Sequence, residues 1–487
     1  MSLSIGIKIT QKRYKGMNMK YKFYAVLFCL SWVFTARAQK PDSAFNFSLN
    51  EAIEYAQQHQ SSILNASLDE QIASNTVRQT IGIGLPQING TLDFLYFIKI
   101  PTTFLPDFIS PSVYNVLNKE GVKDANGNTI QIPNDLGGLF PAKFGSKYQS
   151  SAGLEVNQLL FDGSYIVGLQ AAKTFKELSR RNLVRTKIET AVAVTKAYYS
   201  VLINNEQLIL LDANLIRLKK SLNDTEILFK NGFVEKIDTD RLRVLNNNLE
   251  TERENVLSLL ELNVNLLKFQ MGMPIENELK LKDSIKSLQM VPNPVISDST
   301  AYRSRIEFAL LQTQKKLNEL DLKRYKSQFL PSLVAFGSTS SSFQSNSFSK
   351  LYNQSFPTAV IGLRMSVPLI SGGQKLYRVR NAKLEVLKSE NNLQNLRNGI
   401  DLEISQTQTI YTNGMRSLEN QNRNMALATE VLRVSKIKYE QGVGSSLEIT
   451  VAETSLKEAQ NNYINALYDL LINKVNLDKA LGKIKID

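Results

Sequence analysis

The feature that most constrains the fold is a long segment that occurs twice in the chain. Residues 163–271 and 373–481 carry the same pattern at a constant offset of 210 residues. Between Gly168 and Gly232 there is neither Gly nor Pro, so nothing in the sequence forces a helix to end there. Gly232 and Gly442 occupy the equivalent point of the two copies, and Gly is the residue least strained in the left-handed conformation that ends a helix. Each copy therefore predicts two long helices that reverse direction at a glycine.

Leucines recur along these segments at alternating steps of three and four residues, the seam of a helix that packs against another helix. In the first copy the series is Leu208, Leu211, Leu215, Leu218 and Leu222, answered by Leu242, Leu245 and Leu249. At about 1.5 Å per residue, a helix from residue 163 to residue 230 would be a rod about 100 Å long. That length predicts an extended molecule.

The N-terminus is typical of a secretory signal peptide over residues 1–38. Two lysines precede an apolar run at 23–34, and Ala36-Arg37-Ala38 forms a cleavage site. The run is about 12 residues, too short to span a bilayer comfortably. We therefore expect export, and since Cys29 is the only cysteine, we expect no disulfide or lipid anchor in the mature chain.

The formal net charge of +13 does not indicate nucleic-acid binding. Seven basic residues precede residue 39, where no acidic residue occurs, and the remaining charges of both signs are spread along the helices.

An enzyme is not expected either. The mature chain has one histidine, His59, and no cysteine, so a catalytic triad or a metal site lacks parts, and we expect no metal or cofactor.

A shorter helix precedes the repeated segment in each half. Residues 47–80 have an amphipathic pattern that opens with a capping box at Ser48, and residues 299–328 predict the second such helix. Leu-Pro pairs at 85–86 and 330–331 end both helices, because Pro cannot continue a helix.

Four segments alternate between apolar and polar residues, which is typical of strands with one apolar face. They lie near residues 88–100, 150–161, 332–343 and 359–367. Residues 101–147, rich in Pro, Asn and Gly, are expected to form a long loop. The strand length matches that of a tilted membrane strand, about 9 to 11 residues.

Four strands cannot close a barrel. Unpaired backbone groups in lipid cost several kcal/mol each, so other copies must complete the sheet. Two copies would give eight strands, whose interior side chains would fill, and three would give twelve, within the range of outer-membrane barrels. The polar faces and the long rods favour twelve.

Together these features resemble the TolC family of outer-membrane efflux proteins. The resemblance covers nearly the whole mature chain and is carried by the Leu-Pro pairs, by residues 367–373 after the last strand, by Gly442 and by residues 476–482. It implies a mainly α fold with a membrane β-barrel contribution. Two structural repeats per chain, with long helical hairpins and four strands per protomer, would form a trimeric 12-stranded barrel and an α-helical tunnel.

This resemblance divides the chain into four parts. They are the signal peptide at 1–38, a first repeat at 39–273, a connector at 274–298 and a second repeat at 299–487. The first repeat would hold a helix, a β-hairpin at 88–161 and a helical hairpin at 163–271, and the second a helix, a β-hairpin at 332–370 and a helical hairpin at 371–482.

The resemblance also implies a function. The homotrimer would be the passive exit duct of a tripartite efflux or type I secretion system, in contact with outer-membrane lipid and reaching into the periplasm. It would dock to a periplasmic adaptor, or membrane fusion protein, and to an inner-membrane pump of the RND, ABC or MFS type. The alternative is an outer-membrane-anchored trimeric coiled-coil stalk with a structural or adhesive role.

An acidic entrance gate is implied by the same resemblance. Glu448 matches an acid that narrows the periplasmic entrance in the family, whereas the next family acid is Val451 here, and Asp238 and Asp240 have comparable places in the first copy. Three Glu448 carboxylates on a threefold axis would bind cations. The alternative is that Glu448 is a first-turn helix acid favoured by the helix dipole.

The hairpin tips are the candidate surface for the adaptor. They comprise Asn231, Gly232, Phe233 and Val234 in the first copy and Gln441, Gly442, Val443 and Gly444 in the second. Turn chemistry alone accounts for the glycines. Phe233 and Val443 are the stronger candidates, because exposed apolar groups at a helix reversal suit a protein surface.

Overall fold

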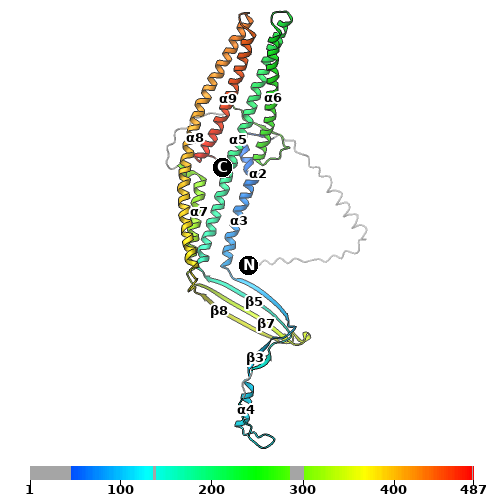
Figure 1. Cartoon of the computed structure of the whole chain (residues 1–487), viewed down its shortest axis with the longest axis vertical. Helices are drawn as coiled ribbons and strands as arrows, with labels where there is room; N and C mark the ends of the chain where they lie inside the picture. Colours follow the sequence, from blue (N-terminus) through cyan, green and yellow to red (C-terminus); the bar gives the residue numbers. More distant parts are fainter. Residues whose placement is uncertain (1–44, 135–138, 286–300, 485, 487) are drawn as a thin grey trace, which may run out of the picture.

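The computed structural model of the chain describes residues 45–134, 139–285, 301–484 and 486. The expected signal peptide and residues 286–298 of the expected connector lie outside these ranges. The described chain is extended, with long helices at one end, and a sheet and a projecting arm at the other (Figure 1). Within the described ranges, no helix has both the length and the apolar character needed to cross a membrane.

An antiparallel sheet continues into a layer of helices. The strands, in spatial order, are β2 (Gln87–Tyr96), β5 (Tyr148–Phe161), β7 (Ser332–Ser345) and β8 (Ser355–Ser366). All four join helices at one end of the sheet: α3 (Ser61–Ile83) precedes β2, α5 (Gly163–Lys230) follows β5, α7 (Ile306–Ser327) precedes β7 and α8 (Gln374–Glu440) follows β8. The helices pack in the same order as the strands (Figure 1). The protomer is thus one curved wall, with β2 and α3 at one edge and β8 and α8 at the other.

Two helical hairpins extend this wall, as the repeat predicted. α5 returns as α6 (Lys236–Met271) and α8 returns as α9 (Ser446–Ala480), and α5 and α8 end 210 residues apart. The predicted leucine seam forms the apolar core of the first hairpin, with buried Leu211, Leu215, Leu218, Leu242, Leu249 and Val256. In the second hairpin, Leu432, Ala452 and Leu456 form the equivalent cluster.

The first short helix is interrupted, so the prediction of one helix over residues 47–80 was wrong. The structure has α2 (Leu49–His59) and α3, separated at Gln60, whose backbone is extended. Gln60 Nε2 donates to the carbonyl oxygens of Phe269 and Gln270 at 3.1 and 3.0 Å. The break is therefore explained by a tertiary contact. The end of α6 leaves backbone carbonyls without partners inside the helix, and Gln60 donates hydrogen bonds to two of them.

The shorter elements complete the wall. The expected helix at 299–328 is α7 preceded by a 3₁₀ turn, η3 (Ala301–Ser304). A turn, η4 (Phe348–Lys350), joins β7 to β8. β1 (Phe45–Phe47) pairs in parallel with β6 (Leu279–Leu281) beside α2, where Phe45, Phe47, Leu279 and Leu281 pack on a core that includes Tyr198 and Met271.

One face of the sheet is mainly apolar and the other is mainly polar, as the alternation predicted. Ile88, Val156, Gly337 and Ile361 are paired across the four strands, and the adjacent row is Asn89, Glu155, Ser338 and Val360. On the apolar face, Leu92 is 86% exposed and Ile361 is 91% exposed. The described part of a single protomer therefore leaves this face uncovered.

The segment expected as a long loop at 101–147 is instead partly regular. β3 (Thr102–Pro106) pairs with β4 (Leu139–Lys143), and α4 (Ile109–Lys119) lies between them in sequence. Pro101, Pro106 and Gly121 stand at or near the ends of these elements, and Ile109, Val113 and Val116 have the spacing of one helix face. β2 ends at Tyr96, before Ile98 and Ile100, which were expected to continue its apolar face.

Candidate entrance and docking site at the hairpin tips

The two hairpin tips have the same backbone structure. Gly232 and Gly442 are left-handed, with φ of 77° and 75°. The N–H of Phe233 donates to the carbonyl of Leu228 at 2.9 Å, and the N–H of Val443 donates to the carbonyl of Lys438 at 3.0 Å. This six-residue closure is the Schellman arrangement, which satisfies carbonyls that the helix end leaves unpaired. The predicted turn chemistry of the tips is confirmed.

The apolar side chains after the two glycines point into solvent. Phe233 is 76% exposed and Val443 is 78% exposed, and the two are equivalent in the repeat. Val234 and Gly444 are half-buried. A Cβ on Gly444 would lie 2.9 Å from the backbone nitrogen of Tyr439, so this glycine is needed for a close approach of the chain. The structure therefore separates the tip residues into exposed apolar groups and turn-forming groups.

The three candidate gate acids lie near the starts of α6 and α9, each beside a cation of its own hairpin. Glu448 Oε2 is 3.8 Å from Lys438 Nζ, and Asp238 Oδ1 is 3.6 Å from Arg241. Asp240 is 4.0 Å from Arg243. Glu448 and Asp238 occupy equivalent first-turn positions, and each has a role in its helix cap: Asp238 accepts from the N–H of Glu235, and the N–H of Glu448 donates to Ser445.

Arg243 is held mainly by a different carboxylate. Its Nη2 donates to Oε1 of Glu226 of α5 at 2.8 Å, which links α6 to α5. This hydrogen bond, together with the charges of Glu226 and Asp240, raises the pKa of Arg243. Asp240 therefore shares its cation with a stronger partner.

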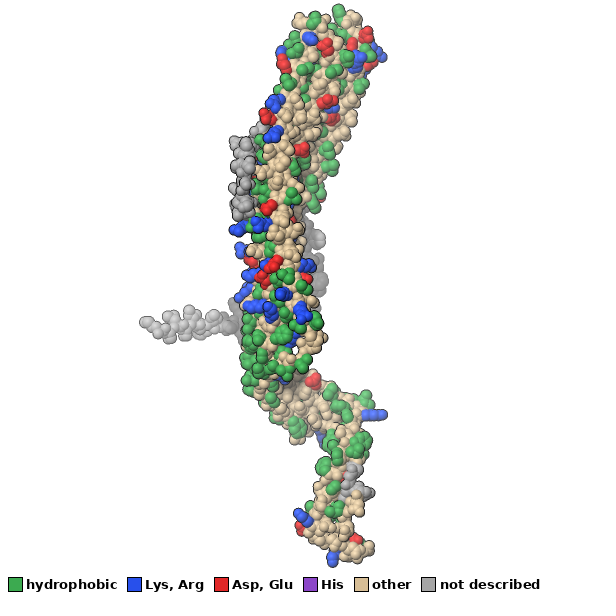
Figure 2. All heavy atoms as spheres, turned by 60° about the vertical axis from the view of Figure 1, so that its left-hand side comes forward, with side chains coloured by type: hydrophobic (Ala, Val, Ile, Leu, Met, Phe, Trp, Pro, Cys, Tyr) green, Lys and Arg blue, Asp and Glu red, His purple; other side chains and the backbone are tan. Residues whose placement is uncertain are grey.

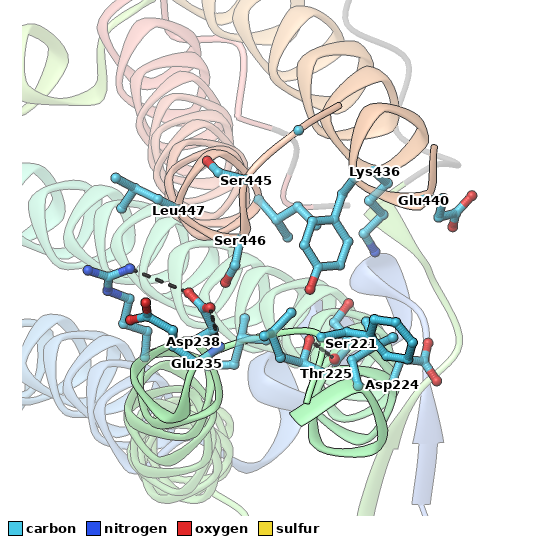
Figure 3. Close-up of a pocket in the computed structure, with 18 of the residues that line it drawn as sticks. Ser221, Asp224, Thr225, Glu235, Asp238, Lys436, Glu440, Ser445, Ser446 and Leu447 are labelled. Carbon is cyan, nitrogen blue, oxygen red and sulfur yellow. Dashed lines mark hydrogen bonds and ion pairs between the residues drawn. The ribbon is translucent and has the colours of Figure 1, made fainter. Parts of the chain in front are cut away.

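A groove of about 950 Å³ separates the two tips. Phe233, Asp238, Gly442 and Gly444 line it, so it contains members of both tips and one candidate gate acid. Ser446 points from the start of α9 across the groove toward Glu235 and Asp238 (Figure 3). The hydroxyl oxygens of Ser446 and Tyr439 are buried and have no hydrogen-bond partner among the described residues of the protomer. Buried polar groups are normally paired, so this groove is incomplete as a protein interior.

Polar contacts join the two hairpins behind this groove. Arg217 of α5 donates to both carboxylate oxygens of Glu453 of α9, at 2.9 to 3.1 Å. Lys436 of α8 lies 3.4 Å from the same carboxylate, which is 5% exposed. Nearby, Lys457 of α9 is 2.5 Å from Glu252 of α6. At this level the apolar seams lie within the hairpins and these contacts between the hairpins are polar, whereas closer to the sheet Ile203 of α5 packs with Ile464 and Leu467 of α9.

These contacts were not predicted from the sequence, although a signal was present. Glu453 lies four residues after Ile449 and three before Leu456, both buried, so it occupies a seam position of α9. A carboxylate at a seam position requires a buried partner. That partner, Arg217, is on a different hairpin, and no periodicity in the sequence points to it.

Comparison with known proteins finds similarity to outer-membrane proteins. Residues 299–483 match the outer membrane efflux protein family. The chain is 22% identical over 339 residues to the proteases secretion protein PrtF of Dickeya chrysanthemi, covering 68% of this chain and 72% of PrtF. It is 22% identical over 346 residues to the outer membrane protein TolC of Salmonella enteritidis, covering 69% of this chain and 70% of TolC.

The fold is also shared with a solved structure. A crystal structure of CusC matches with a TM-score of 0.71 at 17% identity, covering 90% of this chain and 92% of CusC. At 90% coverage of this chain, the match cannot be confined to its second half. It therefore includes the first half of the chain, which lies outside residues 299–483.

Proposed function

The chain belongs to the TolC-like outer membrane efflux proteins, and from this premise we propose that it is the passive exit duct of a tripartite efflux or type I secretion system. Three copies would close the duct in the outer membrane and extend it into the periplasm. The hairpin tips would meet a periplasmic adaptor, which in turn serves an inner-membrane pump of the RND, ABC or MFS type.

The observation that carries this proposal is the shape of the protomer wall. Its strands and helices follow the same order and leave matching free edges, β2 with α3 and β8 with α8. Open strand edges in lipid cost several kcal/mol for each unpaired group, so the wall requires copies of itself. Closing the sheet and the helical layer together would produce a barrel continued by a tunnel.

The exposed apolar surface supports a position in the membrane. Leu92 and Ile361 are almost fully exposed on one face of the sheet, and Leu369 and Ile370 are similarly exposed where β8 leads into α8. Hydrophobic side chains gather at this junction of sheet and helices (Figure 2). A surface of this kind is expected to contact lipid or another copy of the chain.

The purified protein in a planar bilayer should test the proposal. We expect a trimer that carries ionic current with a preference for cations, because three Glu448 carboxylates would converge at the entrance. In Glu448→Gln, the ratio of cation to anion permeability should fall by about twofold or more. Glu254→Gln removes a carboxylate that is 72% exposed on α6 and should leave the ratio unchanged.

Two results would contradict this proposal. A monomeric and non-conducting protein would rule out the exit duct. A trimer without conductance would favour the alternative, a trimeric coiled-coil stalk. If the trimer conducts but Glu448→Gln keeps full cation selectivity, the duct stands and Glu448 is only a first-turn helix acid.

Docking of an adaptor to the tips gives a separate prediction. In the double variant Phe233→Asp and Val443→Asp, the chain should retain about a tenth or less of the co-purifying periplasmic adaptor, because central apolar anchors contribute most of the binding energy of an interface. The measurement is quantitative mass spectrometry of the tagged chain isolated from its own cells.

Phe144→Asp is the matched control, since Phe144 is 62% exposed just after β4, far from the tips. This variant should retain the adaptor at the wild-type level. Equal adaptor recovery with both variants would remove the tips from the docking surface, provided that each variant remains trimeric.

A further inference from the structure

The arm that projects from the sheet carries an apolar stripe that the described part of its own chain does not cover. Ile109, Val113 and Val116 are exposed on α4, and the helix has no buried residue. Their spacing of four and then three residues places them on one face, as in a helix that packs on other helices. A helix of this length is marginal by itself in water, so α4 is expected to need a partner.

Lipid is a poor candidate for that partner. The rings of Tyr96, Tyr148 and Phe348 form a cluster where β2 ends and β5 begins, with centroids 5.1 and 5.7 Å apart. Lys147 Nζ lies 5.4 Å from the Tyr96 ring. Aromatic rings beside basic groups are typical of the boundary between lipid and water. The arm begins beyond this cluster and extends away from the sheet, so α4 would lie in water outside the membrane (Figure 1).

Other copies of the arm are within reach. With strands about 4.8 Å apart and tilted by about 40°, a barrel of twelve strands has a radius of about 12 Å. Each strand of the β3–β4 hairpin has five residues. At about 3.3 Å per residue, the hairpin spans about 17 Å, enough to bring α4 from the barrel wall to the threefold axis.

We propose that the three α4 helices of the trimer pack together through Ile109, Val113 and Val116 and form a cap over the outer end of the duct. This inference rests on the trimer of the proposed function. The arm is linked to β2, one of the two free edges through which the copies would meet, so assembly gathers the arms at high effective concentration. Lys119 is the only charged residue of α4, and it stands at the end of the helix, so like charges do not oppose contact along the stripe.

Cysteine cross-linking of the full-length trimer in its native membrane tests this packing. Cys29 is the only native cysteine and lies in the expected signal peptide. In Val113→Cys, a short bismaleimide should join two of the three chains and give a cross-linked dimer on a denaturing gel. Asn115→Cys is the matched control, because Asn115 is exposed and lies about 200° around the same helix. We expect about tenfold less dimer from Asn115→Cys.

A second variant keeps the test independent of the thiols. Val113→Asp should increase the single-channel conductance of the trimer. It places one carboxylate of each α4 helix near the threefold axis, and the three like charges would repel one another and open the cap. Asn115→Asp should leave the conductance unchanged.

Each alternative outcome is distinguishable. A stable trimer in which Val113→Cys gives no dimer, or no more dimer than Asn115→Cys, would overturn the cap while leaving the duct intact. A cross-link from Val113→Cys to a different protein would also overturn it. If no trimer can be isolated, the proposed function and this inference fail together.

Discussion

Gly272→Ala is expected to lower the free energy of unfolding by about 3 kcal/mol or more, because strain and a backbone clash add at this position. Gly272 follows α6 with φ of 71°, a conformation in which Ala is strained by about 1 to 2 kcal/mol. A Cβ at this position would also lie 2.6 Å from the carbonyl oxygen of His59 and 2.8 Å from the Cα of Gln60. These are backbone atoms, which cannot move aside as a flexible side chain can.

Gly232→Ala separates the clash from the strain. Gly232 has nearly the same φ, 77°, but a Cβ there would meet no described atom within 4 Å. This variant should therefore lose only about 1 to 2 kcal/mol. Thermal unfolding followed by circular dichroism checks both variants. Equal losses would show that the contact between the end of α6 and the α2–α3 break does not contribute to stability.

The contact at Gly272 belongs to a junction between the start of a short helix and the end of a long one. The chain contains this junction, called the joint below, twice. In the first half, Gln60 precedes α3 and donates to Gln270 near the end of α6. In the second half, Arg305 precedes α7 and donates to Ala480, the equivalent residue at the end of α9, at 3.0 Å. The glycines after the two helices are also equivalent, since Gly482 approaches Ser304 as Gly272 approaches His59. The duplication thus includes these capping contacts, in which the residue before each short helix donates to a carbonyl oxygen near the end of a long helix.

The sequence predicted the hairpins well because their signals are local. A glycine at each tip and leucines at regular steps suffice to place two helices and the turn between them, and the structure confirms both. The joint was missed because Gln60 breaks a helix without a Gly or Pro. Its reason to break lies in the carbonyl oxygens of Phe269 and Gln270, about 210 residues away in the sequence.

The candidate site also combines features that the sequence predicted with features that it could not predict. The exposure of Phe233 and Val443 follows from their place after a helix-ending glycine, and the sequence predicted it. The Arg217–Glu453 contact depends on how one hairpin lies against the other, which no local pattern specifies. The roles of Glu448, Asp238 and Asp240 depend on other copies of the chain, and they stay predictions that the conductance experiment addresses.

Arg305→Met is expected to destabilise the second joint by about 2 to 3 kcal/mol, because it removes one partner of a buried ionic network. The Arg305 side chain is 6% exposed, and its guanidinium lies 3.0 Å from Glu307 and 2.9 Å from Glu403. The two carboxylates are 29% and 40% exposed, so water would partly compensate them, and the expected loss is below that of a fully buried pair. The Ala480 carbonyl oxygen would lose its donor as well.

Arg433→Met is the matched control on the surface. Arg433 lies 2.6 Å from Glu430, yet both side chains are more than half exposed, so the loss should be below about 1 kcal/mol. Thermal unfolding of both variants at neutral pH provides the comparison. Similar losses of unfolding free energy at the two sites would mean that burial does not increase the contribution of the Arg305 contacts to stability.

The pH dependence of Arg305→Met gives the joint a second, independent readout. Burial alone would raise the pKa of Glu307, but the hydrogen bond from Arg305, a backbone hydrogen bond and the charges of Arg305 and Lys479 together hold this pKa below its usual 4.5. A lowered carboxylate pKa stabilises the folded state above about pH 4.5, and this stability is lost as the pH falls through the folded pKa. Without Arg305, the pKa of Glu307 should rise from its wild-type value, so the deficit of the variant should be largest at neutral pH and shrink as the pH falls below about 4.5. A deficit that stays constant between pH 7 and pH 4 would assign the role of Arg305 to packing and to the Ala480 carbonyl, not to its charge.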